Sequence, residues 1–312
     1  MTSNFEFLEK EFPVLANFGG LAEKYCYSDP NSCLMKVGMI GETIVNLMFT
    51  YDKIPFPFDN TAVNRIHVLS SEGFLTKDLT DILHALRKVR NKAVHENYAE
   101  ESDCPIFLQM AYSLSEWFMQ TYGDWNYQHC DFVMPVKENE QLTANKEQEE
   151  KIEEQLTNAA LNDANQAAKV EKNERIKRAN EVANQRQKSE AETRYMIDEQ
   201  LRQVGWEADT EKLRYSKGVR PEKGRNMAIA EWPTDSDVGK KGRADYALFV
   251  GTRLVGIIEA KAEHKDIPSV IDYQGKEYPK NIRTQDEKYC IGTWDKYKVP
   301  FTFATNGRPY LE

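Results

Sequence analysis

The stretch Gly242–Glu263, GRADYALFVGTRLVGIIEAKAE, holds two short β-type runs joined by a glycine-containing connector of hairpin length. The runs are Ala244–Val250 and Leu254–Ala262, and both are rich in Val, Ile, Leu, Tyr and Phe. Side chains alternate between the two faces of a strand, so Glu259 and Lys261 point to the same face. If the two strands pair, Asp245 in the first run lies across from them. The stretch therefore predicts two carboxylates and a lysine on neighbouring strands.

This combination of side chains suits a divalent metal site. Mg²⁺ prefers oxygen ligands, which Asp245, Glu259 and the Ala260 carbonyl supply. Such an ion polarises a phosphodiester and lowers the pKa of a bound water. Lys261 would orient that water or stabilise the developing negative charge. Glu259 closes an apolar run, where a carboxylate is costly unless it is paired or metal-bound. The alternative interpretation is an edge hairpin with ordinary solvated charges.

A helix is expected to follow the hairpin, starting near Pro268-Ser269. Gln274 and Tyr278 are four residues apart and so share one face of that helix. Because Pro279 is a poor helix residue, we expect a kink or an end near Tyr278. We assign positioning roles: Gln274 would hydrogen-bond the phosphate or a metal-bound water, and Tyr278 would bond backbone or stack on a base. The alternative is that Tyr278 packs in the core while Gln274 faces solvent.

An acid on one strand, E-x-K on the next and Q-x-x-x-Y on the following helix together resemble the PD-(D/E)xK nuclease superfamily. The Q-x-x-x-Y form is similar to the branch found in recombination nucleases and type I restriction motor subunits. The chain departs from the superfamily name, because Arg243-Ala244 precedes Asp245 where proline gives the motif its initial. The resemblance implies an α/β nuclease with a central mixed sheet flanked by helices.

A helix with the sequence EAETRYMIDEQLRQV is expected over Glu190–Val204, before the hairpin. The pattern E-T-R-x-x-I-D-x-x-L-x-x-x-G-W resembles the opening of type I restriction R-subunit nucleases. By that resemblance, Glu192 is the candidate for a helix acid that assists the metal site. Asp198 and Glu199 are rivals, and helix phase alone does not choose among the three.

Basic side chains surround the candidate site in sequence. Lys212–Arg225 carries six lysines and arginines, with Glu222 as its only internal acid. Basic loops beside a carboxylate metal site suit a phosphate backbone. The predicted DNA-binding residues are Lys217, Arg220, Lys240, Lys241 and Arg243. The alternative is ordinary solvated loop charge.

Residues 1–135 predict an all-α domain, because apolar residues recur at helical spacing. Helices are expected over Cys33–Phe49, Thr61–Leu69, Thr76–Glu96 and Pro105–Tyr122. Within the third helix, Arg90-Asn91 followed by His95 resembles the HEPN superfamily, in some members of which the arginine and histidine form a ribonuclease pair. The alternative is a surface arginine beside a capping or packed histidine.

Residues 136–189 contain neither glycine nor proline and are dense in Glu, Gln, Asn, Lys and Ala. This composition predicts a helix, but its apolar stripe is thin. We expect a solvated spacer helix. If the helix continued to Val204, where this stretch without glycine or proline ends, it would be about 100 Å long at about 1.5 Å per residue. Partial disorder is the alternative. Residues 190–312 then form the predicted nuclease domain.

Bulk properties exclude several classes of protein. The formal net charge of −9 lies entirely in the first 189 residues, since residues 190–312 contain 21 basic and 21 acidic residues. An acidic chain argues against a non-specific DNA coat. The sequence contains no run of about 18 apolar residues, so a membrane span is not expected. The five cysteines form no C-x-x-C pair, which favours reduced thiols in a cytoplasmic protein.

Taken together, these patterns resemble the N-terminal part of a type I restriction endonuclease R subunit, in an α+β multidomain chain. The resemblance implies a Mg²⁺-dependent DNA endonuclease that cuts double-stranded DNA in a complex with modification and specificity subunits. ATP is implied for the full enzyme only, because the chain has no G-x-x-x-x-G-K-[ST] phosphate loop. The alternatives are a free-standing HEPN–nuclease fusion for nucleic-acid defence and a non-catalytic assembly module.

Overall fold

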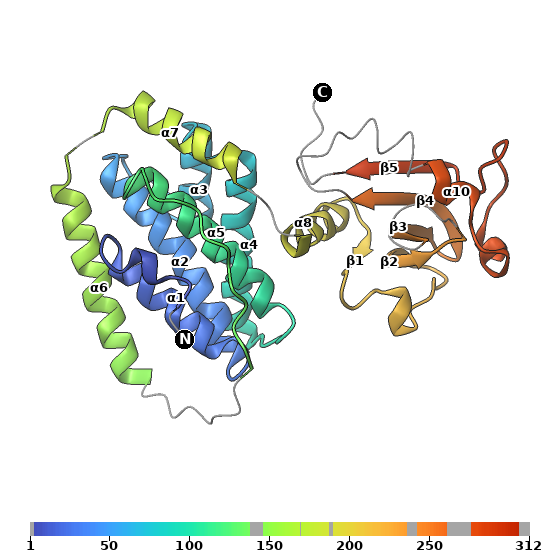
Figure 1. Cartoon of the computed structure of the whole chain (residues 1–312), viewed down its shortest axis with the longest axis horizontal. Coiled ribbons are helices and arrows are strands. Elements are labelled where there is room, and N and C mark those ends of the chain that lie inside the picture. The colour runs from blue at the N-terminus through green and yellow to red at the C-terminus, as the bar shows by residue number, and fades with distance from the viewer. Residues whose placement is uncertain are drawn as a thin grey trace. The chain divides into compact units, whose positions relative to one another are not determined.

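A computed structural model describes residues 3–137, 146–168, 170–186, 190–235, 242–260 and 276–305. Backbone contacts divide the chain into two compact units, Met1–Arg186 and Gln187–Glu312 (Figure 1). The first unit is helical, and the second is built on a five-stranded sheet. The predicted α+β organisation is therefore confirmed, with a helical unit that precedes a mixed α/β unit.

The helical unit is organised around α2 (Pro30–Tyr51), which makes its most extensive contacts with four other helices of its unit. Those four are α1 (Pro13–Tyr25), α4 (Lys77–Glu96), α5 (Cys104–Tyr122) and α6 (Lys146–Gln166). The shorter α3 (Ala62–Ser71) lies against α4. Caps begin three of the helices, because the side chains of Asp29, Thr61 and Thr76 accept hydrogen bonds from backbone amides in the first turn.

Helix α2 is long and apolar enough to cross a membrane by length and composition alone. Most of its apolar stretch, 72%, is buried inside the unit. Its side chains form the centre of the core, where Ile40, Ile44 and Leu47 are fully buried. This burial is what a core helix of a bundle requires, since an apolar surface on every side must be covered by other helices.

The charged stretch after residue 136 differs from the predicted solvated spacer helix. It forms two described helices, α6 and α7 (Lys172–Gln185), and both pack on the first unit. Small side chains make close packing feasible: Ala164 on α6 and Ala179 on α7 are fully buried. The indole of Trp117 donates to the Ala179 carbonyl at 2.9 Å. The apolar stripe was too thin to predict this docking because alanine and long charged side chains supply much of the contact.

The second unit contains a sheet of strand order β1-β2-β3-β4-β5. The strands are β1 (Glu207–Ala208), β2 (Asn226–Pro233), β3 (Arg243–Val250), β4 (Arg253–Ala260) and β5 (Phe301–Thr305). The three central strands pair antiparallel, whereas β1 and β5 pair parallel to their neighbours. The predicted hairpin is confirmed, and the sheet is mixed as expected.

Two hydrophobic clusters cover the two faces of this sheet, because successive strand residues alternate between faces. On one face, helix α8 (Glu190–Gln203) packs Ile197 and Leu201 against Tyr246 of β3. On the other face, Tyr278 of the short helix α10 (Lys276–Lys280) packs against Ala247 and other strand residues. Three-residue and six-residue 3₁₀ helices (Tyr215–Lys217 and Thr284–Tyr289) complete the unit.

Candidate functional site

The β3–β4 hairpin holds the two predicted carboxylates at the same end of neighbouring strands. Its turn leaves Gly251 in the left-handed region at φ +58°, where glycine is tolerated best. The antiparallel register pairs Tyr246 with Ile258, so one further step places Asp245 opposite Glu259. Side chains directly opposite in such a pair lie on the same face of the sheet. The structure thus brings together the two acids that the sequence identified.

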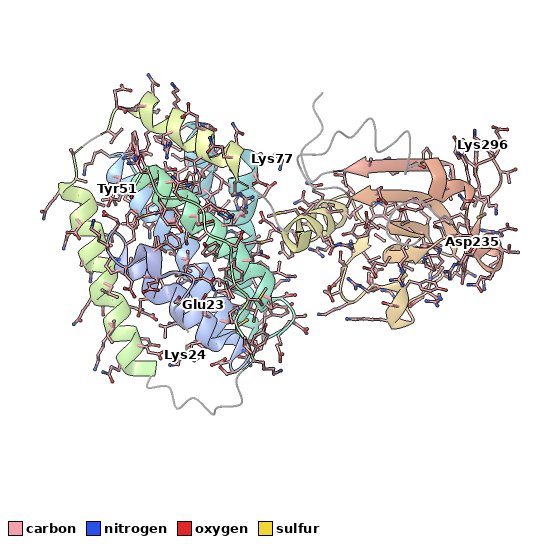
Figure 2. All side chains as sticks on the ribbon, in the orientation of Figure 1. Glu23, Lys24, Tyr51, Lys77, Asp235 and Lys296 are labelled. Carbon is pink, nitrogen blue, oxygen red and sulfur yellow. The ribbon has the colours of Figure 1, made fainter. Side chains whose placement is uncertain are left out.

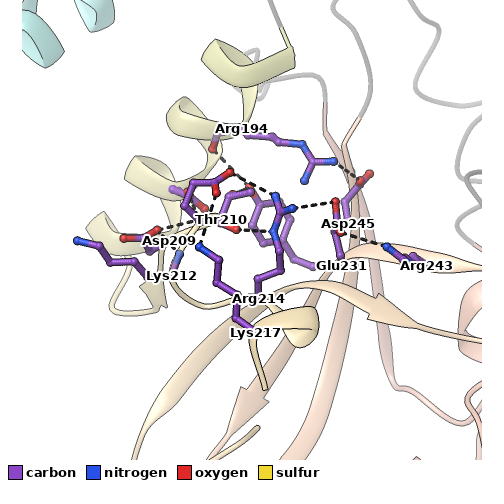
Figure 3. A network of polar contacts seen from close by, with 12 residues as sticks. Arg194, Asp209, Thr210, Lys212, Arg214, Lys217, Glu231, Arg243 and Asp245 are labelled. Carbon is purple, nitrogen blue, oxygen red and sulfur yellow. Dashed lines mark hydrogen bonds and ion pairs between the residues drawn. The ribbon is translucent and has the colours of Figure 1, made fainter. Parts of the chain in front are cut away.

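The Asp245 carboxylate accepts hydrogen bonds from a backbone N–H and from an arginine side chain (Figure 3). Its Oδ2 accepts a hydrogen bond from the backbone N–H of Ala260 at 2.7 Å, which ties the first strand to the end of the second. Its Oδ1 accepts from a guanidinium nitrogen of Arg194 at 3.3 Å. Arg194 comes from α8, and its side chain is only 14% exposed. The cation therefore compensates a carboxylate in a largely desolvated position.

Glu259 is the more deeply buried of the two acids, at 3% exposure. It directly follows Ile257 and Ile258, which are also buried, so the strand carries the carboxylate to the edge of the core. Removing a carboxylate from water is costly unless charged or hydrogen-bonding groups compensate. A carboxylate that is buried in spite of this cost is typical of a functional site that uses its negative charge.

Tyr278 lies close to both acids. Burial raises the pKa of its phenol, and the negative charges of Glu259 and then Asp245 raise it further. The side chain is fully buried, and its hydroxyl makes no hydrogen bond with the part of the chain that the structure describes. Tyr278 thus packs in the core, as the alternative interpretation expected, while its hydroxyl is near the carboxylates. Gln274 and Lys261 lie outside the described residues.

The three candidate helix acids on α8 occupy different environments. Glu192 is buried at 1% exposure. Asp198 accepts a hydrogen bond from the backbone N–H of Thr210 at 2.7 Å, so it anchors the loop after β1. Glu199 pairs with Arg202 on the helix surface at 2.7 Å. Asp198 and Glu199 therefore have evident structural partners away from Asp245.

The described members of the predicted DNA-binding set each contact nearby protein groups. Arg243 lies 3.3 Å from Glu231, and Lys217 lies 3.9 Å from Glu211. The guanidinium of Arg220 stacks over the Tyr215 ring at 3.6 Å from its centroid. All are surface contacts of low individual strength, so the cations stay available to a phosphate. Lys240 and Lys241 lie outside the described residues.

The network in Figure 3 also contains residues that the sequence analysis did not assign. Arg214 lies 3.6 Å from Glu231, and its Nε donates to the Thr210 carbonyl at 3.1 Å. Glu231 has φ +53° within β2, which is unusual for a side-chain-bearing residue. The E-T-R motif contained Arg194, but its contact with Asp245 depends on how α8 packs on the sheet. The sequence showed only that a cationic residue on a predicted helix, Arg194, precedes the strand that carries Asp245.

Among the described residues, no group of three or more His, Cys, Asp or Glu side chains is arranged to hold a metal ion. The predicted set was smaller, two carboxylates and the Ala260 carbonyl. Hard oxygen donors of that kind fit Mg²⁺, which keeps several waters and needs few protein ligands. The contact between Arg194 and Asp245 shows that a cation is accommodated at this carboxylate. The donor chemistry therefore fits the ion.

The predicted Arg90–His95 pair is not assembled within this chain. Arg90 forms an ion pair with Glu42 of α2, whereas His95 is exposed near the end of α4. Five residues along an ideal helix correspond to a rotation of roughly 140° between the two side chains. Arg90 instead lines a cavity in the helical unit.

Comparison with known proteins adds four findings. Residues 207–312 match a family model described as the second domain of the type I restriction enzyme EcoKI endonuclease subunit. Residues 21–168 match a model of a domain of unknown function, DUF4145. Over 384 aligned positions the chain is 30% identical to the type I restriction enzyme EcoKI endonuclease subunit of Escherichia coli (strain K12). That alignment covers 99% of this chain and 33% of the relative. No solved structure matches the chain.

Proposed function

We propose that this chain, which is related along nearly its whole length to the endonuclease subunit of a type I restriction enzyme, carries the DNA-cleaving site of such an enzyme. The resemblance predicted from its motifs is confirmed by that relative and by the family model. The observation that carries the proposal is the placement of Asp245 opposite Glu259, with Tyr278 near both.

The reaction proposed is hydrolysis of a phosphodiester in double-stranded DNA with Mg²⁺. Asp245, Glu259 and the Ala260 carbonyl would hold the ion. When bound, it supplies a water of lowered pKa and an electrophile for the phosphate oxygen. Arg194 holds the Asp245 carboxylate in place from α8, and the Ala260 N–H fixes its second oxygen. Both contacts orient the acid before substrate arrives, which lowers the cost of reorganisation.

Other residues act on the substrate in this proposal. Lys261 stabilises the negative charge that develops on the phosphate, and Gln274 and Tyr278 position the phosphate or the attacking water. Glu192 assists as the helix acid. Lys217, Arg220, Lys240, Lys241 and Arg243 contact the DNA backbone, which predicts binding that weakens steeply with salt.

The proposed setting follows the relative rather than this chain alone. The chain spans 33% of the relative's length, so cleavage is expected only in a cytoplasmic complex with modification and specificity subunits and with ATP. Recognition of a DNA sequence is assigned to those other subunits. The placement of Asp245 opposite Glu259 supports the proposal.

The test uses the assembled restriction complex, with Mg²⁺, ATP and plasmid DNA carrying its recognition sites. Asp245→Asn and Glu259→Gln should each slow double-strand cleavage at least a thousandfold, about 4 kcal/mol of transition-state stabilisation. Glu207→Gln is the matched control, because Glu207 is an exposed strand acid that pairs only with Arg225 among the described residues. Cleavage at the wild-type rate by either site variant would contradict the proposal.

A second readout separates metal binding from catalysis. Calorimetric titration of the purified chain with Mn²⁺ should show one site that both substitutions weaken and that Glu207→Gln leaves unchanged. Loss of cleavage with unchanged metal binding would place the two acids elsewhere in the reaction.

A further inference from the structure

The guanidinium of Arg194 lies at the carboxylate pair of the sheet unit (Figure 3). A terminal nitrogen of Arg194 is 3.3 Å from Oδ1 of Asp245, and the two side chains are 14% and 15% exposed. Asp245 faces Glu259 across the β3–β4 pair, and like charges directly opposite each other destabilise a sheet. Arg194 therefore brings positive charge to a place where the fold holds two negative charges together.

The two oxygens of the Asp245 carboxylate have contacts of different strength. Oδ2 accepts a hydrogen bond from the Ala260 N–H at 2.7 Å, within the same hairpin. Oδ1 accepts from Arg194 of α8 at 3.3 Å, whereas a charge-assisted N–H···O bond is typically about 2.7–2.9 Å long. The contact with Arg194 is therefore the weaker one. Asp245 thus has one oxygen fixed by its own hairpin and one oxygen whose partner can be exchanged.

Other contacts anchor the backbone of Arg194 beside Asp245. Tyr246 follows Asp245 on β3, and its hydroxyl donates to the Arg194 carbonyl at 3.4 Å. The same hydroxyl lies 2.7 Å from the hydroxyl of Thr210. The N–H of Thr210 in turn donates to Asp198, one turn further along α8. These contacts fix the helix on the sheet, so the side chain of Arg194 can change its partner while the helix stays in place.

The position of Arg194 has a consequence for metal binding. Asp245 and Glu259 are the acids proposed to hold a divalent ion, and Oδ1 of Asp245 already faces a guanidinium. Two positive charges beside one carboxylate repel each other, most strongly where little water screens them. Arg194 therefore opposes binding of the ion as long as its guanidinium stays at Asp245.

A guanidinium that leaves Asp245 needs another anion, because a largely buried positive charge is costly when it loses a partner. The substrate proposed for this site supplies one, since every nucleotide of DNA carries a negatively charged phosphate. A planar guanidinium with five N–H donors binds phosphate through two parallel hydrogen bonds. Arg194 lies at the carboxylates themselves, whereas Lys217 and Arg220 belong to the loop between β1 and β2. Arg194 is thus the described cation best placed for the phosphate at the cleaved bond.

From these features we propose that Arg194 exchanges partners during the reaction: it neutralises Asp245 until a divalent ion is bound, and it then contacts the phosphate at the cleaved bond. This inference rests on the proposed function, because it assigns a second role to a residue of the same site. The Ala260 N–H keeps Asp245 oriented during the exchange. Arg194 thus lowers the affinity for the ion when DNA is absent and couples binding of the ion to binding of DNA.

A role of Arg194 in orientation alone predicts the opposite change in metal affinity. If the contact only orients Asp245, loss of the guanidinium should weaken binding of the ion, because a carboxylate that is less well ordered is a poorer ligand. If Arg194 competes with the ion, loss of its positive charge should tighten binding. The sign of the change therefore separates exchange from orientation.

The first experiment is calorimetric titration of the purified chain with Mn²⁺ in the absence of DNA. Arg194→Met keeps most of the side-chain stem and removes the charge, so we expect it to bind Mn²⁺ about tenfold more tightly than the unmodified chain. Arg194→Lys keeps the charge and should bind Mn²⁺ with nearly unchanged affinity. The control is Lys296→Ala, because Lys296 is an exposed cation at the end of the same unit away from α8 (Figure 2). The control should bind Mn²⁺ like the unmodified chain.

Thermal unfolding without and with Mn²⁺ gives a readout that depends on the same competition. Arg194→Met should melt below the unmodified chain without Mn²⁺, because two carboxylates then lie together without this guanidinium. Mn²⁺ should raise its melting temperature more than it raises that of the unmodified chain, since tighter binding to the folded state stabilises it more. If Arg194→Met does not fold, Arg194→Gln serves as the uncharged variant in both measurements.

The second experiment tests the contact with phosphate in the assembled restriction complex. At saturating Mg²⁺, Arg194→Met should cleave plasmid DNA at least tenfold more slowly, although it binds the ion more tightly. Arg194→Lys should keep part of the rate, because an ammonium also binds phosphate but lacks the planar fork of a guanidinium. Lys296→Ala should cleave at the wild-type rate.

The outcomes separate this inference from the proposed function. Weaker or unchanged Mn²⁺ binding by the uncharged variant would overturn the exchange and leave the proposed function intact. Tighter binding with cleavage at the wild-type rate would also overturn it, because Arg194 would then make no contact with the phosphate. Mn²⁺ binding that Asp245→Asn leaves unchanged, or no Mn²⁺ binding to the unmodified chain, would contradict the proposed function and this inference with it. Tighter Mn²⁺ binding combined with slower cleavage supports the exchange.

Discussion

The two units bury carboxylates in different ways. In the helical unit, Asp52 is buried and lies 3.4 Å from the guanidinium of Arg175 on α7, and it accepts a hydrogen bond from the Tyr122 hydroxyl at 2.7 Å. In the sheet unit, Asp198 is buried with the Thr210 N–H as its hydrogen-bond donor. Its Oδ1 accepts no hydrogen bond from the described residues. Burial therefore raises the pKa of Asp198 to about 6.

This difference distinguishes a buried carboxylate that is paired with a cation from a buried carboxylate whose hydrogen-bond donors are mainly neutral. A buried carboxylate with a buried cation depends on that cation, because removal of either group leaves an uncompensated charge. A buried carboxylate with mainly neutral donors keeps its proton at higher pH. Asp245 is intermediate, since Arg194 and a backbone N–H contact it while Glu259 is its cross-strand neighbour. Three substitutions test these distinctions.

The largest effect on stability is expected from Arg175→Ala. The side chain is 4% exposed, pairs with Asp52, donates to the Thr121 carbonyl and stacks over the Tyr122 ring at 4.2 Å. Its loss leaves Asp52 buried without this cation, so the free energy of unfolding should fall by about 3–5 kcal/mol. Lys177→Ala is the control on the same helix, because Lys177 is 77% exposed. Urea unfolding of both variants measures the difference.

That measurement also tests whether α7 belongs to the helical unit. A solvated spacer helix would unfold independently, and Arg175→Ala would then change the stability of the unit no more than Lys177→Ala does. Equal midpoints for the two variants would contradict the docking described above.

The next effect depends on pH and concerns Asp198→Asn. The pKa of Asp198 is raised from 3.8 to about 6, so the folded state keeps a proton that the unfolded state has already lost between these values. The wild-type contribution is therefore fully favourable below pH 3.8 and is lost as the pH rises to about 6, by about 3 kcal/mol. Asparagine does not titrate, and its side-chain oxygen can still accept the Thr210 hydrogen bond.

The free energy of unfolding, measured in denaturant between pH 4 and pH 7, should therefore fall less steeply with pH in Asp198→Asn than in the wild type. Glu199→Gln serves as the control, because Glu199 lies on the same helix and pairs with Arg202 at the surface. Parallel pH curves for the wild type and Asp198→Asn would show that this carboxylate ionises normally.

The smallest effect is expected from Tyr278→Phe. The hydroxyl has no hydrogen-bond partner among the described residues, so its removal should leave the melting temperature almost unchanged. If the hydroxyl positions the phosphate or a water beside Asp245 and Glu259, cleavage in the assembled complex should slow at least tenfold, about 1.4 kcal/mol. The loss should appear in kcat rather than in DNA affinity. Cleavage at the wild-type rate would show that Tyr278 only packs in the core and has no positioning role.

The candidate site was accessible from sequence because it depends on local rules. Side chains alternate along a strand, and a short glycine-containing turn sets the register of a hairpin. These rules place Asp245 opposite Glu259 without knowledge of the rest of the chain. Arg194 was quoted within a motif, yet its contact with Asp245 was not predicted, because it depends on the packing of α8 against the sheet.

By itself, the sequence determined many of the elements and their order: the helices from Pro30 to Tyr122 and the hairpin follow from periodicity, capping and turn residues. The tertiary structure decided which charges meet. Docking of α6 and α7 on the bundle, the Arg175–Asp52 pair and the arginine-lined cavity all join residues far apart in the chain. Periodicity reports which face of an element is apolar, but not which element covers it. Alanine and the stems of charged side chains bury well only when a matching surface approaches, and that surface exists only in the folded chain.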